Sequence, residues 1–176
     1  MPSLAKRYTA ILLAFSTLPA LAVTPTAELR LYPVGKIVSA GLSWRFDAQT
    51  EWGASVLYNR ARRGDAGRHE DESGDGFGLG VELSRFWKPA PQGWFYGARA
   101  ELFALDIDWR DPGRDGDSSI TVIQPTLRLG YRTRPFFRSL SAAVAANAGV
   151  EINVATRGEK VGEGAIGLLS FALSYE

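Results

Sequence analysis

Few side chains in this sequence are able to carry out nucleophilic catalysis. The chain contains no cysteine and a single histidine, His69. Cysteine nucleophiles, thiolate zinc sites and disulfides are therefore excluded, and so is any cluster of histidine ligands. Serine hydrolysis needs a base within hydrogen-bonding reach of the hydroxyl, and Ser73 is the serine nearest to His69 in the sequence. Charged residues and glycines surround both between Arg63 and Asp75, so we interpret His69 as an exposed loop residue and predict no catalytic residue.

The remaining motifs indicate neither a metal site nor a cofactor. Asp111–Gly116 resembles the start of a calcium-binding loop, but such a loop needs Asp or Asn at the position of Gly113 and Glu at that of Val122. The glycines between Gly76 and Gly80 alternate along one face of a strand and do not form a phosphate-binding loop. We therefore predict no metal and no cofactor.

The overall charge excludes a further class of function. The chain has 20 Lys and Arg residues against 19 Asp and Glu residues, which gives a formal net charge of +1 at pH 7. A protein that binds nucleic acid non-specifically shows a one-sided excess of basic residues. The sequence therefore predicts no nucleic-acid partner.

The first 22 residues have the pattern of a secretory signal peptide. Lys6 and Arg7 precede the apolar stretch Ala10–Leu18, and a cleavage site of the A-x-A type ends at Ala22. The apolar stretch is shorter than the about 18–20 residues that a membrane-spanning helix requires. We expect the signal peptide to be residues 1–22 and residues 23–176 to form one domain.

Apolar and polar residues alternate with a period of two in eight segments of this domain. Period two is the pattern of a β-strand with one apolar face and one polar face. No apolar run in the domain approaches the length of a membrane-spanning helix. The predicted strands are Thr26–Pro33, Lys36–Phe46, Trp52–Asn59, Phe77–Ser84, Trp94–Leu102, Ile123–Tyr131, Ser141–Ile152 and Leu169–Tyr175.

Alternation alone does not say which face of each strand points inward. The apolar face lines the interior of a soluble barrel of the lipocalin type, but it faces lipid in a membrane barrel. In this sequence the polar face combines small residues with arginine and glutamate, a pair suited to enclosed, bidentate ion pairing. We therefore predict that the apolar face meets lipid. The predicted interior ion-pair network consists of Glu28, Arg30, Arg45, Glu82, Arg99, Glu101, Arg128 and Glu151.

The connections between the predicted strands alternate in length. Short turns on one side of the membrane and long hydrophilic loops on the other are typical of outer-membrane barrels. We expect the short turns at 47–51, 88–93 and 133–138, and the long loops at 62–76, 106–119 and 155–164.

Aromatic residues gather beside the predicted short turns. Trp and Tyr side chains prefer the interface between hydrocarbon and headgroups, so they mark the level of that interface. Tyr58, Phe77 and Trp109 would form a second girdle at the other interface. The first predicted girdle consists of Trp44, Trp52, Trp87, Trp94, Tyr131 and Tyr175.

With these features the chain resembles the small eight-stranded outer-membrane barrels of the OmpA/OmpX type. The resemblance covers Val23–Glu176 and includes the last strand, Phe171–Tyr175. A final strand with an aromatic residue at or near its end resembles the signal read by the barrel-assembly machinery, although this chain adds Glu176 after the aromatic. The resemblance implies an all-β fold, an eight-stranded antiparallel up-and-down transmembrane β-barrel. Chain length agrees, because a sixteen-stranded porin would need about 160 residues in strands alone.

The expected function follows from this architecture. An eight-stranded barrel is just wide enough for side chains to fill its interior. We therefore expect a monomeric, non-enzymatic barrel without a wide channel in the outer membrane of a Gram-negative bacterium, with a structural or surface-interaction role. Its expected partners are the lipid bilayer, lipopolysaccharide and the barrel-assembly machinery. The alternatives are a lipid A-modifying enzyme, as some barrels of this shape are, a soluble periplasmic lipocalin-like carrier, and a narrow pore.

Two segments break the regular alternation. Between Phe103 and Trp109, the apolar residues Leu105 and Ile107 fall on the interior side, which indicates either a β-bulge or a strand that extends above the membrane. Pro125 lies within a strand that must pair on both sides, so a bulge is expected there as well.

Overall fold

Eight β-strands make up most of the structure, a computed structural model that describes residues 23–89, 92–136 and 139–175. The predicted signal peptide, residues 1–22, lies outside the described residues. A single turn of 3-10 helix, Gly64–Ala66, follows the third strand. The strands are β1 (Val23–Tyr32), β2 (Gly35–Arg45), β3 (Thr50–Arg62), β4 (Asp71–Phe86), β5 (Gly93–Asp111), β6 (Arg114–Arg132), β7 (Leu140–Arg157) and β8 (Gly164–Tyr175).

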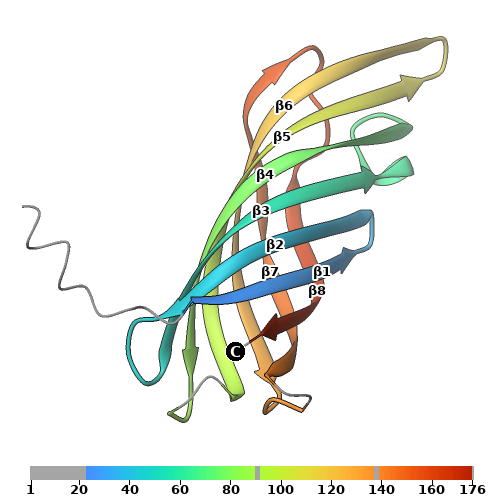
Figure 1. The fold of residues 1–176 in the computed structure, drawn as a ribbon. Coiled ribbons are helices and arrows are strands. Elements are labelled where there is room, and N and C mark those ends of the chain that lie inside the picture. Colours follow the sequence, from blue (N-terminus) through green and yellow to red (C-terminus); the bar gives the residue numbers. More distant parts are fainter. Residues whose placement is uncertain (1–22, 90–91, 137–138, 176) are drawn as a thin grey trace, which may run out of the picture.

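The strands form one closed barrel in which each strand pairs with its sequence neighbours in antiparallel orientation (Figure 1). β1 also pairs with β8, from Thr26 opposite Ser174 to Leu31 opposite Leu169, and this pairing closes the ring. Every described strand therefore has a neighbour on both sides. Such closure matters in hydrocarbon, where the N–H and C=O groups of an open edge would find no partner. The predicted eight-stranded antiparallel barrel is confirmed.

The connections at the two ends of the barrel do not differ as strongly in length as predicted, because the strands extend into the predicted loops 62–76 and 155–164 and reduce them to 63–70 and 158–163. We name the end where β1 begins and β8 ends the terminal end, and the opposite end the distal end. The terminal end carries the connections 46–49, 87–92 and 133–139, and the distal end carries 33–34, 63–70, 112–113 and 158–163.

The hairpin of β5 and β6 rises beyond the other strands at the distal end (Figure 1). Each of these strands has 19 residues. The prediction of a long loop at 106–119 is wrong, because the two strands pair as far as Asp111 opposite Arg114, around a two-residue turn. Gly113 in this turn has a φ of +80°, which residues with a Cβ rarely adopt. The many acidic residues suggested a loop, but side chains on the outer face of a projecting hairpin are solvated just as well.

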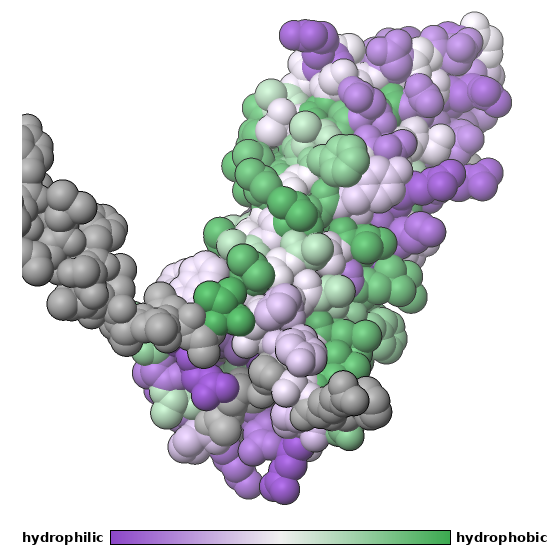
Figure 2. Space-filling model, viewed as in Figure 1, coloured by the Kyte–Doolittle hydropathy of each residue, from purple (hydrophilic) through white to green (hydrophobic). Residues whose placement is uncertain are grey.

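A band of apolar side chains surrounds the middle of the barrel. Figure 2 shows hydrophobic residues there, between hydrophilic surfaces at the two ends. The exposed fraction reaches 71% for Leu127 and 72% for Phe77. A soluble protein rarely leaves so large an apolar surface uncovered, so the predicted orientation of the apolar face agrees with the structure. Among residues 23–89, 92–136 and 139–175, no helix is long and apolar enough to cross a membrane.

The interior changes character along the barrel. Ion pairs fill the middle, whereas the distal half encloses an apolar core. At the level of that core the outer face is polar, since Asp106 and Asp108 are exposed there. Along β5 and β6 the middle is thus apolar outside and polar inside, and the distal part is the reverse. The apolar core consists of Tyr32, Ile37, Leu57, Phe103, Leu105, Ile107, Trp109, Ile120, Val122, Val161, Ile166 and Leu168.

This reversal explains the irregular alternation in β5. Pairing of β5 with β4 and with β6 continues through Phe103–Trp109 without a shift in register. The β-bulge predicted as one possibility is therefore absent from this segment. The other possibility, a strand that extends past the apolar band, agrees with the structure, because Leu105 and Ile107 enter the distal core.

The bulge predicted at Pro125 lies elsewhere. Around Pro125 the pairing of β6 with β7 keeps its register, from Ile123 opposite Ile152 to Thr126 opposite Gly149. A Cβ on Gly149 would lie 2.0 Å from the Pro125 carbonyl oxygen, so the close approach of the two strands requires glycine. The register shift occurs instead between Thr121 and Val122, nearer the distal end.

Candidate functional site

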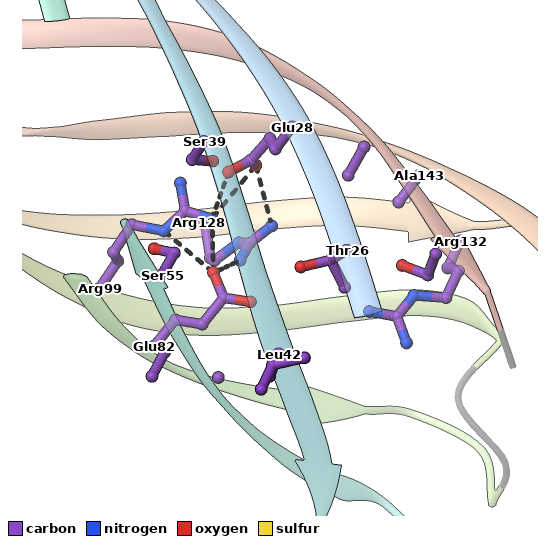
Figure 3. Close-up of a pocket in the computed structure, with 14 residues that line it drawn as sticks. Thr26, Glu28, Ser39, Leu42, Ser55, Glu82, Arg99, Arg128, Arg132 and Ala143 are labelled. Atoms are coloured by element: carbon purple, nitrogen blue, oxygen red, sulfur yellow. Dashed lines mark hydrogen bonds and ion pairs between the residues drawn. The ribbon is translucent and has the colours of Figure 1, made fainter. Parts of the chain in front are cut away.

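Four charged side chains from β1, β4, β5 and β6 meet in the centre of the barrel (Figure 3). Arg99 donates from Nε to Glu82 Oε2 at 3.0 Å, and its Nη2 lies 2.8 Å from Glu28 Oε2. Arg128 donates to the same Glu82 carboxylate and lies 3.7 Å from Glu28 Oε1. An unpaired charge enclosed in this way would be strongly destabilising. Two arginines and two glutamates therefore neutralise one another.

The network continues towards the distal end. Arg30 Nη1 donates to Glu101 Oε2 at 2.6 Å, and Arg30 Nε lies 3.4 Å from Glu28 Oε2. Gln124 Nε2 donates to Glu101 Oε2 at 3.5 Å. Arg30, Glu101 and Gln124 are each at most 2% exposed. Because Arg30 and Glu101 are 71 residues apart in sequence, their ion pair ties opposite walls of the barrel together.

A separate ion pair lies near the terminal end. Arg132 donates from Nη1 and Nη2 to the two oxygens of Glu51, at 2.8 and 2.7 Å, in a bidentate arrangement. Its guanidinium lies 5.0 Å from the centroid of the Phe86 ring, which packs against Phe95. This pair was not predicted from the sequence, because Glu51 falls in a predicted turn and Arg132 lies just past a predicted strand. The period of two would have found Arg132, which shares a strand face with Arg128.

The structure places the eight residues of the predicted network in three settings. Glu151 is buried near the distal end, where its Oε2 pairs with Arg63 Nη2 at 3.0 Å. Arg45 is exposed and forms no ion pair within the described residues, so its assignment to the interior is wrong. The alternation predicts which face of the strand carries Arg45 but not its position along the barrel axis. β2 ends at this residue, where the side chain reaches solvent. The other six residues form the central network described above: Glu28, Arg30, Glu82, Arg99, Glu101 and Arg128.

The residues of the first predicted girdle lie near the terminal end of the barrel. The Trp87 and Trp94 rings stack with their centroids 6.1 Å apart, and Trp94 meets Tyr131 edge to face at 5.6 Å. Trp44 is half-buried, and the other five side chains are exposed: Trp52, Trp87, Trp94, Tyr131 and Tyr175.

The second predicted girdle is only partly formed. Tyr58 and Phe77 face outward as neighbours, with ring centroids 5.2 Å apart. The assignment of Trp109 to this girdle is wrong, because its side chain lies inside the barrel and is 7% exposed. The reversal of polarity along β5 turns this aromatic residue into a part of the distal core.

One carboxylate, that of Glu72, holds two loops over the distal end. It accepts hydrogen bonds from the backbone N–H groups of Arg68 at 2.7 Å, His69 at 3.2 Å and Gly162 at 3.0 Å. Arg63 Nη1 contributes an ion pair at 3.3 Å. The Glu72 side chain is fully buried. We name the two loops that it joins, residues 63–70 and 158–163, the cap.

The electrostatics of Glu72 favour its charged form. Burial acts to raise the pKa of Glu72, but the three backbone donors and the Arg63 guanidinium outweigh burial, so the pKa lies below the ordinary glutamate value. Glu72 is therefore ionised at neutral pH, when it holds the cap most strongly.

His69 is the second link between the loops of the cap. Its ring stacks on Trp109 with centroids 4.4 Å apart. Nδ1 lies 2.8 Å from Asp111 Oδ2, and Nε2 lies 3.2 Å from the Lys160 carbonyl oxygen. Both partners are oxygen atoms, so each ring nitrogen is engaged by the surrounding structure. The hydrogen bond from His69 is the main reason why the pKa of Asp111 lies below its ordinary value.

The prediction of an exposed His69 is therefore wrong, and the reason is tertiary. The residues that bury its ring lie on β5 and in the loop 158–163, far away in the sequence. Ser73 is not among the hydrogen-bond partners of the ring. Within the described part of the chain, no group of three or more His, Asp or Glu side chains is placed to hold a metal ion. In this arrangement the imidazole joins one loop of the cap to the other and to β5.

The centre of the barrel leaves little room for a solute. Val161 of the cap is 1% exposed and packs into the distal core, which it closes from above. Below that core, the cavity around the central network has a volume of about 30 Å³, enough for roughly two water molecules.

Comparison with known proteins adds to the evidence on the fold. No protein-family model matches the chain, and no curated protein matches its sequence. The N-terminal β-barrel domain of Pseudomonas aeruginosa OprF is similar with a TM-score of 0.50 at 14% identity, covering 87% of this chain and 96% of that chain. Neisserial surface protein A gives 0.49 at 10% identity, covering 87% and 94%. Acinetobacter baumannii CarO gives 0.49 at 13% identity, covering 88% and 97%. The likeness to the OprF domain shows the fold alone, and on that level the resemblance to small eight-stranded barrels is confirmed.

Proposed function

We propose that this protein is an integral barrel of the bacterial outer membrane with a closed interior, and that it serves without catalysis as a structural or surface-interaction element. The band of exposed apolar side chains supports a position in the bilayer. The aromatic residues at the terminal end suit the interface with the periplasm, and the polar distal end suits the cell surface. In this orientation the lipid bilayer and lipopolysaccharide surround the chain, and the barrel-assembly machinery inserts it.

The observation that carries the proposal is the obstruction of the interior by side chains at successive levels. The Glu51–Arg132 pair lies at the terminal end, the central ion pairs follow, and the apolar core lies above them. The cap covers the distal end with Val161 inserted. A solute would have to displace several buried ion pairs and an apolar core to pass. The closed ring of strands also leaves no described edge to pair with a second copy, which favours a monomer.

Electrical recording tests the closed interior. The mature chain is folded in detergent, checked for the heat-modifiable gel mobility of a folded barrel, and added to a planar bilayer beside a large porin as the positive control. We expect a baseline without steady large openings. Steady large openings by the folded protein would refute the closed interior, and recovery of the chain in the soluble periplasm rather than in washed membranes would refute the location.

The structure also bears on the lipid A-modifying alternative. Both ring nitrogens of His69 are engaged, by Asp111 and by the Lys160 carbonyl, which leaves neither free to accept a proton from a serine. We therefore expect cells that produce His69→Ala to have the same lipid A acylation pattern as cells that produce the unchanged protein. A pattern that depends on His69 would reinstate the enzymatic function.

A further inference from the structure

Three basic side chains form a row on the outer face of β2 and β3, at the upper edge of the apolar band. Lys36, Arg60 and Arg62 are all exposed and point away from the interior, since they alternate with the buried Ile37, Asn59 and Ala61 along the two strands. Lys36 and Arg60 are direct partners across the two strands. We name these three residues, Lys36, Arg60 and Arg62, the cationic row.

The cationic row has no partner of its own in the protein. None of its three side chains takes part in an ion pair or a side-chain hydrogen bond within the described residues. Asp75, the residue opposite Arg60, instead accepts a hydrogen bond from Tyr58 at 3.0 Å. Like charges directly opposite one another, such as Lys36 and Arg60, destabilise a sheet, whereas an opposite charge stabilises it. Asp75 can offset the charge of Arg60, but Lys36 and Arg62 face Leu31 and Ser73 on their other neighbours, so the row keeps an excess of positive charge.

The height of the cationic row matches the level of lipid headgroups. Directly below it, Val38, Tyr58 and Phe77 are paired across β2, β3 and β4 and face outward. Val38 is 49% exposed and Phe77 is 72% exposed, as expected for residues in contact with hydrocarbon. Two residues along a strand span about 7 Å. The headgroup region of one leaflet is about 5–8 Å deep, so the row lies where lipid phosphates are found.

Acidic residues predominate on the outer face of β4, β5 and β6 at the same end, although Arg110 is exposed there too. On β4, β5 and β6, Asp75 is opposite Asp106, and Asp108 is opposite Asp117, all on the outer face. These carboxylates repel phosphate, so a bare anionic headgroup is bound more favourably on the side formed by β2 and β3. The asymmetry therefore assigns the anion to one sector of the rim.

We propose that the cationic row is a docking surface for the phosphate groups of an outer-leaflet glycolipid, with the acyl chains of the lipid lying against Val38, Tyr58 and Phe77. The proposal rests on the proposed orientation, with the distal end at the cell surface. An acidic protein fits less well, because the row lies on the strands beside the apolar band, within the headgroup layer, and not on a projecting loop. Arginine suits phosphate because its guanidinium donates two parallel hydrogen bonds.

The test measures lipid binding by the detergent-folded protein with native mass spectrometry. The probes are lipid A with both phosphates, lipid A from which the phosphates have been removed, and inorganic phosphate. The test variant is Lys36→Gln/Arg60→Gln/Arg62→Gln. The matched control, Arg45→Gln/Arg85→Gln/Lys88→Gln, removes three exposed bases at the terminal end.

We expect the phosphorylated lipid to bind the unchanged protein and the control variant equally. Each basic residue near a lipid surface contributes about a factor of five, so the test variant should lose affinity roughly 100-fold. Equal binding of the dephosphorylated lipid, equal loss in the control variant, or unchanged binding by the test variant would overturn the proposal. Inorganic phosphate bound as tightly as the lipid would overturn the commitment to lipid. The gel mobility of the variants confirms that they are folded, and because conductance is measured separately, failure of this proposal is distinguishable from failure of the closed interior.

Discussion

Removal of the Glu72 carboxylate should release the cap while the barrel stays folded. In Glu72→Ala, three backbone N–H groups, of Arg68, His69 and Gly162, lose their acceptor, and Arg63 loses an ion-pair partner. A buried donor left unpaired costs about 1–3 kcal/mol. The cap lies at the end of the barrel that water can reach, so the lower limit applies, and the three amides together cost about 3 kcal/mol.

Hydrogen exchange measures this cost directly. Since 1.4 kcal/mol corresponds to a factor of ten, the amides of the two loops should exchange roughly 100-fold faster in Glu72→Ala. Amides in the middle of the strands should keep their protection, because their partners belong to neighbouring strands. Glu70→Ala is the matched control, since this exposed side chain holds no loop amide, and its exchange should equal that of the unchanged protein. Unchanged exchange at Gly162 in Glu72→Ala would refute the reasoning.

Three further predictions concern the ion pairs, the apolar band and the pH response. Glu82→Ala removes one of the two carboxylates that the enclosed Arg99 and Arg128 share, leaves an excess of buried positive charge, and should lower the free energy of unfolding by about 3–5 kcal/mol; a urea midpoint equal to that of the unchanged protein would contradict this role. Leu127→Arg places a charge in the middle of the apolar band and should cost about 2–4 kcal/mol in lipid vesicles, whereas Leu127→Phe should cost little; equal effects would contradict the lipid-facing orientation. Because the pKa of Glu72 is lowered by folding, its stabilisation of the cap is fully present above the ordinary glutamate value of about 4.3 and is lost as the pH falls through the lower folded value. The NMR shifts of the amides that donate to Glu72 should therefore titrate with a midpoint below about 4.3, and a midpoint above that value would show that burial dominates.

The architecture was readable from the sequence because alternation is a local property. A period of two over eight segments fixes the number of strands, and the pairing of Arg with Glu on the polar faces indicates which side is enclosed. The position of a residue along the barrel axis, in contrast, cannot be read from its neighbours in the sequence. Arg45 has the right face but lies at the open end of a strand, whereas Glu51 and Arg132, at the margins of the predicted strands, form a buried pair.

The cap was beyond sequence reasoning for a related reason. His69, Trp109 and Lys160 are far apart in the chain and meet only once the barrel has closed. The segment around His69 is rich in charges and glycines, as solvated loops are. Its burial depends on the face of Trp109 and on the Asp111 carboxylate, both supplied by β5. No spacing within the loop itself signals those partners.

The reversal of polarity along β5 and β6 means that the outer face of the barrel is suited to lipid in its middle and to water at the distal end. In the apolar band the side chains that face the bilayer are apolar and the charged side chains are enclosed. Above the band, β5 and β6 resemble a water-soluble protein, with apolar side chains inside and polar side chains outside. A leucine introduced on the outer face of β5 or β6 should therefore be tolerated within the apolar band and be unfavourable above it, where the outer face meets water. Substitutions in the distal core, which contains Leu105 and Ile107, should therefore follow the packing rules of globular proteins. Substitutions in the apolar band remain constrained by the bilayer.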